Sequence, residues 1–204
     1  PSAPAVPGAP PIAGQSPAAP NPASATGIPP NAPVLSAIID RNAAIAATGR
    51  IKVDTPALTG SINLTGGRLD DISLKKYKET IKPDSDIVHL LSPSGTANPF
   101  YVETGFVAQD QALKLPKPDS KWKSNSSMLT PARPVTLTWD NGAGLIFKRT
   151  VSVDDRYMFS IRNSVENKSA KPATLYPYSL VARTGKPKTA GFYVLHEGLV
   201  GVIG

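Results

Sequence analysis

The sequence predicts an all-β protein made of two stacked antiparallel sheets. Apolar and polar side chains alternate along residues 134–182, and turn residues interrupt this alternation about every ten positions. Residues 54–80 have the pattern of a β-hairpin with Gly66 and Gly67 at its turn. Helical composition is confined to one short segment, residues 34–48. Many strands that each bury one face are accommodated by packing one sheet on another.

The stretch 134–182 gives the clearest strands. Val135, Leu137 and Trp139 alternate with threonines, and a turn follows at 140–142. Further alternating runs cover 145–153, 157–165 and 175–181, with turns at 154–156 and 167–169 between them. We expect four successive strands of one antiparallel sheet with a single buried face.

The preceding region supplies shorter strands. Gly66-Gly67 joins two runs into a hairpin, and Gly105 marks a bulge in a later strand. Residues 109–133 are polar and rich in Lys, Ser and Pro, which predicts a long loop with little strand. The expected strands here are 50–55, 58–64, 68–77, 87–91 and 100–108. We therefore expect roughly nine or ten strands in all.

The chain divides into three segments. Residues 1–33 contain 11 of the 22 prolines and no charged side chain, which predicts a disordered Pro/Ala-rich linker. Residues 34–49 predict a short helix or the end of that linker. Residues 50–204 are enough for one β-sandwich domain with a core of its own. The apolar, glycine-rich end, 191–204, stops without a terminating signal, so we expect a domain truncated at its C-terminus.

The net charge of +7 raises the question of an anionic partner. Lysines cluster at 75–82 and at 114–123. The clusters lack the aromatic residues and glycine-rich loops of nucleic-acid modules, so no nucleic-acid partner is expected. A solvated strand face explains them, and proximity to an anionic membrane surface is the alternative.

Candidate reactive groups are few and scattered. His89 lies within a strand, and His196 is followed by Glu197 without another histidine nearby. The carboxylates of Asp70 and Asp71 are adjacent on a strand and are expected to point to opposite faces. Because these groups do not converge and the chain has no cysteine, we predict no catalytic residue, no metal site and no cofactor.

Three aromatic residues are the candidates for a groove or a partner contact. Tyr176 and Tyr178 are expected on one side of the last predicted strand, on either side of Pro177. Together with Trp139 they could bind a sugar or an extended apolar peptide. The alternative is core packing with the hydroxyl groups at the rim.

Three stretches in order resemble a known family: 54–80, 144–169 and the closing VLHEGLVG at 194–201. Together they resemble the large periplasmic domain of the YidC family of bacterial membrane protein insertases. The Pro/Ala-rich lead is similar to the linker that follows the first transmembrane helix of that family. The resemblance covers about residues 45–204.

This resemblance implies a β-supersandwich similar to galactose mutarotase. It implies a non-catalytic periplasmic interaction domain of an inner-membrane protein, whose transmembrane segments are absent from this chain. The family inserts and helps fold inner-membrane proteins, alone or with the Sec translocon. The implied partners are SecDF and SecYEG components and nascent membrane proteins, and the isolated domain is expected to be a monomer.

Two other readings of the sandwich stay open. One is a carbohydrate- or peptide-binding module. The other is a mutarotase-like sugar epimerase, for which His89, His196 and Glu197 are the available acid–base groups.

Overall fold

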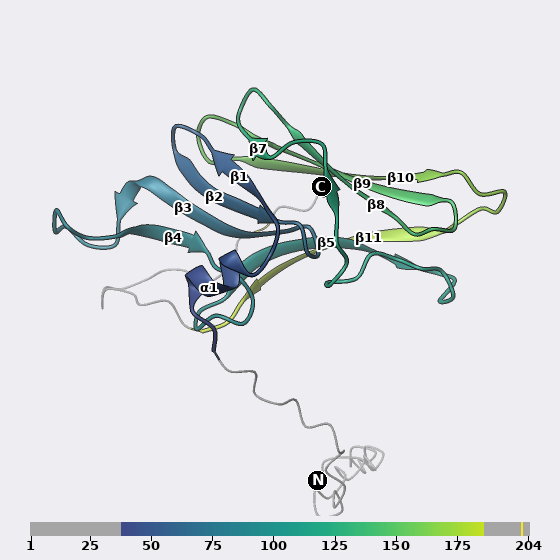
Figure 1. The fold of residues 1–204 in the computed structure, drawn as a ribbon, viewed down its shortest axis with the longest axis horizontal. Helices are drawn as coiled ribbons and strands as arrows, with labels where there is room; N and C mark the ends of the chain where they lie inside the picture. Colours follow the sequence, from purple (N-terminus) through teal and green to yellow (C-terminus); the bar gives the residue numbers. More distant parts are fainter. Residues whose placement is uncertain (1–37, 186–200, 202–204) are drawn as a thin grey trace, which may run out of the picture. The chain divides into compact units, whose positions relative to one another are not determined.

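The computed structural model describes residues 38–185 and Gly201, which form one helix and eleven strands (Figure 1). Three predicted features lie outside the described residues: the linker 1–33, residues 34–37 of the helix, and the stretch around His196 and Glu197. The all-β prediction is confirmed, because strands dominate and pack as two sheets.

The larger sheet has seven strands in the order β11-β5-β3-β2-β1-β7, with β4 also paired to β3. The smaller sheet has four, in the order β10-β9-β8-β6. Every pairing is antiparallel except that of β1 with β7. The strands are β1 Arg50–Asp54, β2 Leu58–Asn63, β3 Arg68–Lys78, β4 Ile87–Leu91, β5 Phe100–Ala108, β6 Lys123–Ser124, β7 Met128–Leu129, β8 Val135–Asp140, β9 Leu145–Val153, β10 Phe159–Asn167 and β11 Leu175–Arg183.

The core lies between the two sheets. Alternate side chains of β9 are buried along its whole length, as the period of two predicts. Its Phe147 ring contacts those of Phe106 on β5 and Trp139 on β8, at centroid distances of 5.5 and 5.6 Å. The larger sheet contributes the apolar side chains of β1, β2 and β3 to the same cluster. Burial of this shared apolar surface is what holds the sheets together.

The helix is shorter than predicted. Helix α1 covers Arg41–Ala46 only, and residues 38–40 before it are not helical. The Asp40 side chain accepts hydrogen bonds from the backbone N–H groups of Asn42 and Ala43, which makes it the N-cap. Because Asp40 caps the helix, the helix begins at Arg41, later than the predicted start at residue 34.

The hairpin between β2 and β3 has the predicted turn. Gly66 and Gly67 have φ angles of 76° and 62°, in the left-handed region that other residues avoid. The pairing then shifts register next to Ser61, so that Asp71 faces Ser61 while Leu69 faces Ile62. This irregularity places one extra residue, Asp70, on the β3 side.

Strand β11 departs from the predicted ladder. Strands β8, β9 and β10 pair in succession, but β11 leaves them and pairs with β5 in the larger sheet. The prediction of four successive strands in one sheet was therefore wrong for the fourth. Asn167, Ser169 and Lys171 form a hydrogen-bonded turn after β10, and the chain then crosses to the other sheet.

The β5–β11 pairing is continuous through Gly105, which corrects the predicted bulge. The backbones at Thr174 and Thr184 bond to Gln109 and Pro99, the residues that flank β5. In the register of the β5–β11 pair, even-numbered residues of β11 therefore direct their N–H and C=O groups toward β5. Odd-numbered residues direct theirs to the opposite edge. Pro177, which has no N–H, therefore lies where the missing donor costs no bond to β5.

Candidate functional site

The one described histidine has a local partner. The His89 Nδ1 atom lies 2.7 Å from the Ser73 hydroxyl on the neighbouring strand β3. In the described part of the chain, no group of three His, Cys, Asp or Glu side chains is arranged to hold a metal ion. The geometry around His89 is that of a surface cross-strand pair.

The two predicted tyrosines lie on the outer face of the larger sheet, as the alternation implied. The Tyr178 ring covers Gly105 on β5, where a Cβ atom would come within 2.6 Å of the ring. Its hydroxyl donates a hydrogen bond of 3.0 Å to Glu103 Oε1. Partial burial and this hydrogen bond raise the pKa of Tyr178. Tyr176 is more exposed, beside Val107.

Trp139 is not brought together with the tyrosines. It belongs to β8 in the smaller sheet, and its ring packs on Phe147 against the core. The three aromatic residues therefore lie on different sheets. A contact surface on this part of the molecule would involve Tyr176 and Tyr178 without Trp139.

An apolar cleft opens between the two sheets. It has a volume of about 300 Å³. The exposed side chain of Leu90 lies at its mouth, as does Tyr157, whose ring centroid is 6.2 Å from that of Tyr77. Strands of both sheets line it, with Leu58, Leu69, Ile72, Leu90, Leu91, Val102, Tyr157, Phe159 and Ile161. Such a cleft suits an apolar side chain or a short apolar segment.

The outer face of the larger sheet carries a buried polar network. Asp70 is 1% exposed, and its carboxylate accepts hydrogen bonds from Arg50 and from the Asn63 amide. Arg50 also donates to Ser61, which in turn donates to Asp71. The register shift therefore brings the two carboxylates into one network, which corrects the prediction of opposite faces. Burial raises the pKa of Asp70, while Arg50 and Asn63 oppose this effect.

Arg41 on helix α1 extends this network, because it pairs with Asp71 and so ties the helix to the sheet. A separate ion pair joins two other strands of the same sheet. Arg68 Nε lies 2.6 Å from Glu103 Oε2, and Glu103 also accepts from Tyr178. These cations are held by carboxylates on neighbouring strands, so they contribute to the structure of the sheet more than to its surface charge.

Arg149 is a buried cation between the sheets. It is 3% exposed, and burial lowers its pKa to about 10. Its guanidinium donates to the carbonyl oxygens of Gly66, Gly67 and Thr104, and to the Asn163 side chain. The group also lies over the Trp122 ring, at 4.8 Å from the ring centroid. Arg149 thus joins β9 to the Gly66-Gly67 turn and to β5.

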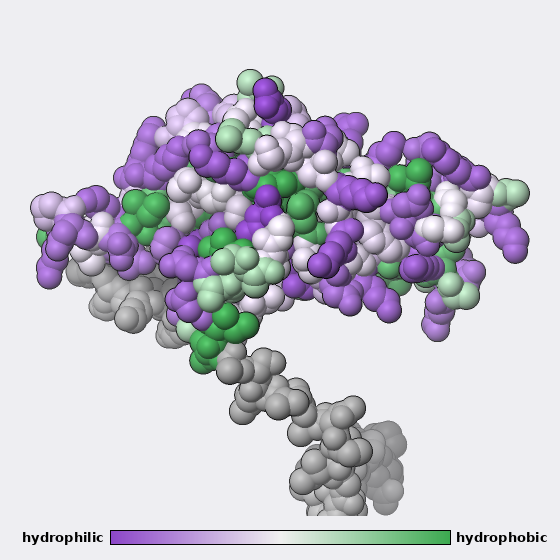
Figure 2. Space-filling view, viewed as in Figure 1, coloured by the Kyte–Doolittle hydropathy of each residue, from purple (hydrophilic) through white to green (hydrophobic). Residues whose placement is uncertain are grey.

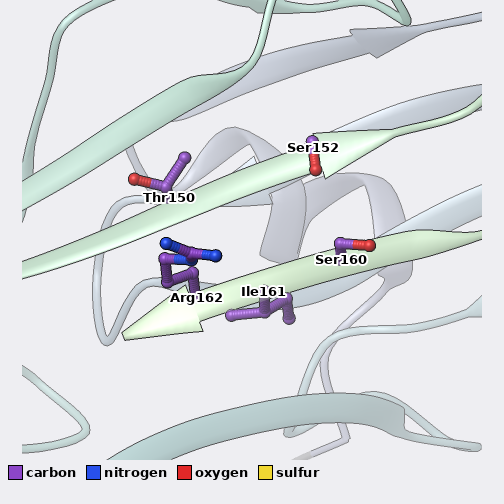
Figure 3. A pocket seen from close by; sticks show the side chains of 5 residues that line it. All are labelled: Thr150, Ser152, Ser160, Ile161 and Arg162. Carbon is purple, nitrogen blue, oxygen red and sulfur yellow. The ribbon is translucent and has the colours of Figure 1, made fainter. Parts of the chain in front are cut away.

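A hollow on the outer face of the smaller sheet is lined by four polar side chains and by Ile161. Its volume is about 630 Å³, and Figure 3 shows the side chains of β9 and β10 around it. Thr150, Ser152 and Ser160 supply hydroxyl groups, and Arg162 supplies a guanidinium group. Arg162 makes no ion pair with any carboxylate of residues 38–185. Its charge is therefore available to an external anion.

The family described as the YidC periplasmic domain matches residues 50–204, a range that includes every described strand. This chain belongs to that family. Two relatives named "Membrane protein insertase YidC" agree with the match. The protein from Beijerinckia indica is 60% identical over 81% of this chain and 28% of its own length. The one from Methylorubrum extorquens is 53% identical over 90% of this chain and 32% of its own length.

A third relative of the same name, from Rhizobium meliloti, is 46% identical over 94% of this chain. The chain spans about a third of the length of the curated relatives it matches. It corresponds to the periplasmic domain of an inner-membrane protein, as the resemblance implied. Among the described residues, no helix is long and apolar enough to cross a bilayer.

Proposed function

We propose that this YidC-family domain is a non-catalytic interaction domain, which holds partners at the periplasmic face of a membrane protein insertase. The observation that carries the proposal is the match of the whole sandwich to the YidC periplasmic domain, with relatives named as insertases. The wider activity, insertion and folding of inner-membrane proteins with or without the Sec translocon, comes to this chain through that relationship.

The described residues offer surfaces to such partners. The apolar cleft accepts an apolar segment, and nascent membrane proteins are rich in such segments. Tyr176 and Tyr178 add an exposed aromatic patch on another face, which could contact SecDF or SecYEG components. We therefore assign the cleft to nascent chains and keep the tyrosines as candidate contacts for the translocon.

A chimera tests this proposal. The chain would replace the corresponding segment of the Beijerinckia indica insertase, with a photoreactive amino acid at Leu90 in the cleft mouth. A ribosome-bound nascent membrane protein, arrested during insertion, is expected to crosslink to this position. The matched control carries the photoreactive group at Glu79, which is exposed and does not line the cleft. The proposal fails if the chimera inserts clients while Leu90 crosslinks no better than Glu79.

The apolar cleft also favours a second candidate function, a peptide-binding module that acts outside an insertase. Titration of the purified chain with an apolar peptide separates the two, since a module of this kind binds tightly without the membrane part. Loss of binding in Leu90→Asp but not in Tyr178→Ala would place the peptide in the cleft. Mutarotation of galactose by the chain would instead support the sugar epimerase and overturn both.

A further inference from the structure

The outer face of the smaller sheet differs from the rest of the surface in the kind of groups it presents. The four strands contain only two carboxylates, Asp140 and Glu166. Five basic side chains lie on or beside them on this face: Lys121, Lys123, Lys148, Arg162 and Lys168. Asp154, which directly follows β9 with the parity of Thr150 and Ser152, adds a third carboxylate. On and beside the strands, the five cations of this face therefore exceed its carboxylates by two.

The positions of these side chains follow from strand register. Lys123 pairs with Thr138, and both line a shallow hollow with Lys121, Asp140 and Ile146. Arg162 pairs with Thr150 one strand pair further along, on the same face. Because alternate residues of a strand share a face, the two hollows belong to one continuous surface.

Three of the five cations are free within the described residues. Glu166 is occupied by Lys148 at 2.9 Å and by Lys168 at 3.4 Å. Lys121, Lys123 and Arg162 form no ion pair with any carboxylate between residues 38 and 185. Lys121 and Lys123 lie at the β6 edge of the sheet and Arg162 lies on the opposite edge strand, β10. The three cations can therefore meet several separated negative charges at once.

One end of this face carries an exposed apolar side chain. Met158, just before β10 and with the parity of Ser160 and Arg162, is 67% exposed, whereas its neighbour Tyr157 lies at the mouth of the cleft between the sheets. An exposed apolar side chain beside cations favours the interface between lipid headgroups and acyl chains. A soluble polyanion would use the cations alone.

We propose that the outer face of the β6-β8-β9-β10 sheet docks on an anionic phospholipid bilayer, with Arg162 and the hydroxyl groups of Thr150, Ser152 and Ser160 holding one lipid phosphate. A guanidinium group donates two parallel hydrogen bonds to phosphate oxygens, and nearby hydroxyls donate further bonds. The inference rests on the proposed function for placing the domain beside the inner membrane.

Flotation with vesicles of stated composition tests the docking. The purified chain is expected to bind vesicles containing phosphatidylglycerol in phosphatidylcholine, and to bind pure phosphatidylcholine vesicles far less. A cation near an anionic membrane contributes about 1 kcal/mol, so Arg162→Gln should reduce partitioning about fivefold. The triple variant with Lys121→Gln and Lys123→Gln as well should lose on the order of 100-fold.

A matched control carries the same loss of charge elsewhere. Lys76→Gln, Lys78→Gln and Lys82→Gln remove three exposed cations at the β3–β4 hairpin. This variant should keep partitioning within about threefold of the original chain, because distant exposed charges are screened. Equal losses in the two triple variants would overturn the assignment of a face. Circular dichroism of each variant verifies that it is folded.

Two further arms define the ligand. Arg162→Lys keeps the charge but not the paired hydrogen bonds, so it should retain part of the partitioning that Arg162→Gln loses. Soluble polyglutamate and inorganic phosphate, at matched ionic strength, should compete poorly with vesicles. Polyglutamate binding as tight as vesicle binding would overturn the membrane in favour of an acidic protein. The vesicle assay contains neither client nor translocon, so its failure is distinct from that of the crosslinking experiment.

Discussion

The outer faces of the two sheets use the same residue types in opposite ways. On the larger sheet, Arg50 and Arg68 are held by the buried carboxylates of Asp70 and Glu103. On the smaller sheet, Arg162 stands among hydroxyl groups without an ion-pair partner in the described structure. Surface colouring by hydropathy shows mostly hydrophilic residues with separate apolar patches (Figure 2), so residue type alone does not reveal this difference.

The difference teaches that burial decides what a charge does. A carboxylate that has lost its water depends on its cation, so the pair resists separation and becomes structural. An exposed cation keeps its hydration and gains little from a neighbour, so it remains available to a partner. The larger sheet therefore uses its charges to hold strands together, whereas the smaller sheet presents them.

The largest expected effect comes from breaking a buried pair. Arg50→Met leaves the Asp70 carboxylate without its cation and should lower the free energy of unfolding by about 3–5 kcal/mol. Arg162→Met, the matched change on the smaller sheet, should alter it by no more than about 0.5 kcal/mol. Urea denaturation measures both. Similar losses in the two variants would remove the distinction between the faces.

A smaller loss is expected where the Tyr178 ring covers Gly105 and its hydroxyl bonds to Glu103. Gly105→Ala places a Cβ atom within 2.6 Å of the Tyr178 ring, so the ring must move away from Glu103. Crowding of this kind should cost about 1–3 kcal/mol. The double variant Gly105→Ala with Tyr178→Ala removes the collision and should cost less than the two single changes combined. Strict additivity in thermal or urea denaturation would contradict the contact.

Double-mutant cycles sharpen the comparison pair by pair. Arg68 and Glu103, both mostly buried, should couple by about 0.5–3 kcal/mol. Lys148 and Glu166, each 43% exposed, should couple more weakly than the buried pair, because solvent screens exposed charges. Replacing each residue by Gln, Met or Ala in turn supplies the cycles. Stronger coupling in the exposed pair would show that burial is not the deciding factor.

The smallest expected effects are two changes of stability with pH that have opposite signs. Burial raises the pKa of Asp70, so the folded protein binds this proton more tightly than the unfolded chain, whose pKa is near 3.8. As the pH falls through the folded pKa toward 3.8, the original chain should therefore gain stability relative to Asp70→Asn.

Glu166 should behave in the opposite way. Hydrogen bonding to Lys148, then its charge and that of Lys168, lower the pKa of Glu166 below 4.5. Its contribution is present above that value and is lost as the pH falls through the folded pKa. Relative to Glu166→Gln, the original chain should thus lose stability. Slopes of the same sign in the two comparisons would contradict these assignments.

Local pattern predicted most strands but not every partner. The alternation and the Gly66-Gly67 turn predicted the hairpin and the strands of 134–182 because both depend on neighbouring residues. The transfer of β11 to the larger sheet depends on which strand edge is free across the core. Nothing within residues 175–183 records that choice, so the sequence predicted the strand but placed it in the wrong sheet.

The charged network was hidden from the sequence for a related reason. Asp70 and Asp71 share a network only because an extra residue shifts the β2–β3 register, and a strict alternation cannot anticipate this. The burial of Arg149 could have been predicted, since Arg149 has the same parity as the buried Phe147 and Val151 of its strand. An arginine on the buried face of an alternating strand is the signal that would have found it.

The position of Pro177 has a consequence for how copies of the domain behave together. A long strand edge offers a row of backbone groups that can template another strand and begin a fibril. The proline removes one donor from the β11 edge that faces away from β5, an edge that pairs with no other strand among the described residues. Molecules crowded at high local concentration thus meet an interrupted template, which works against their polymerisation through this edge.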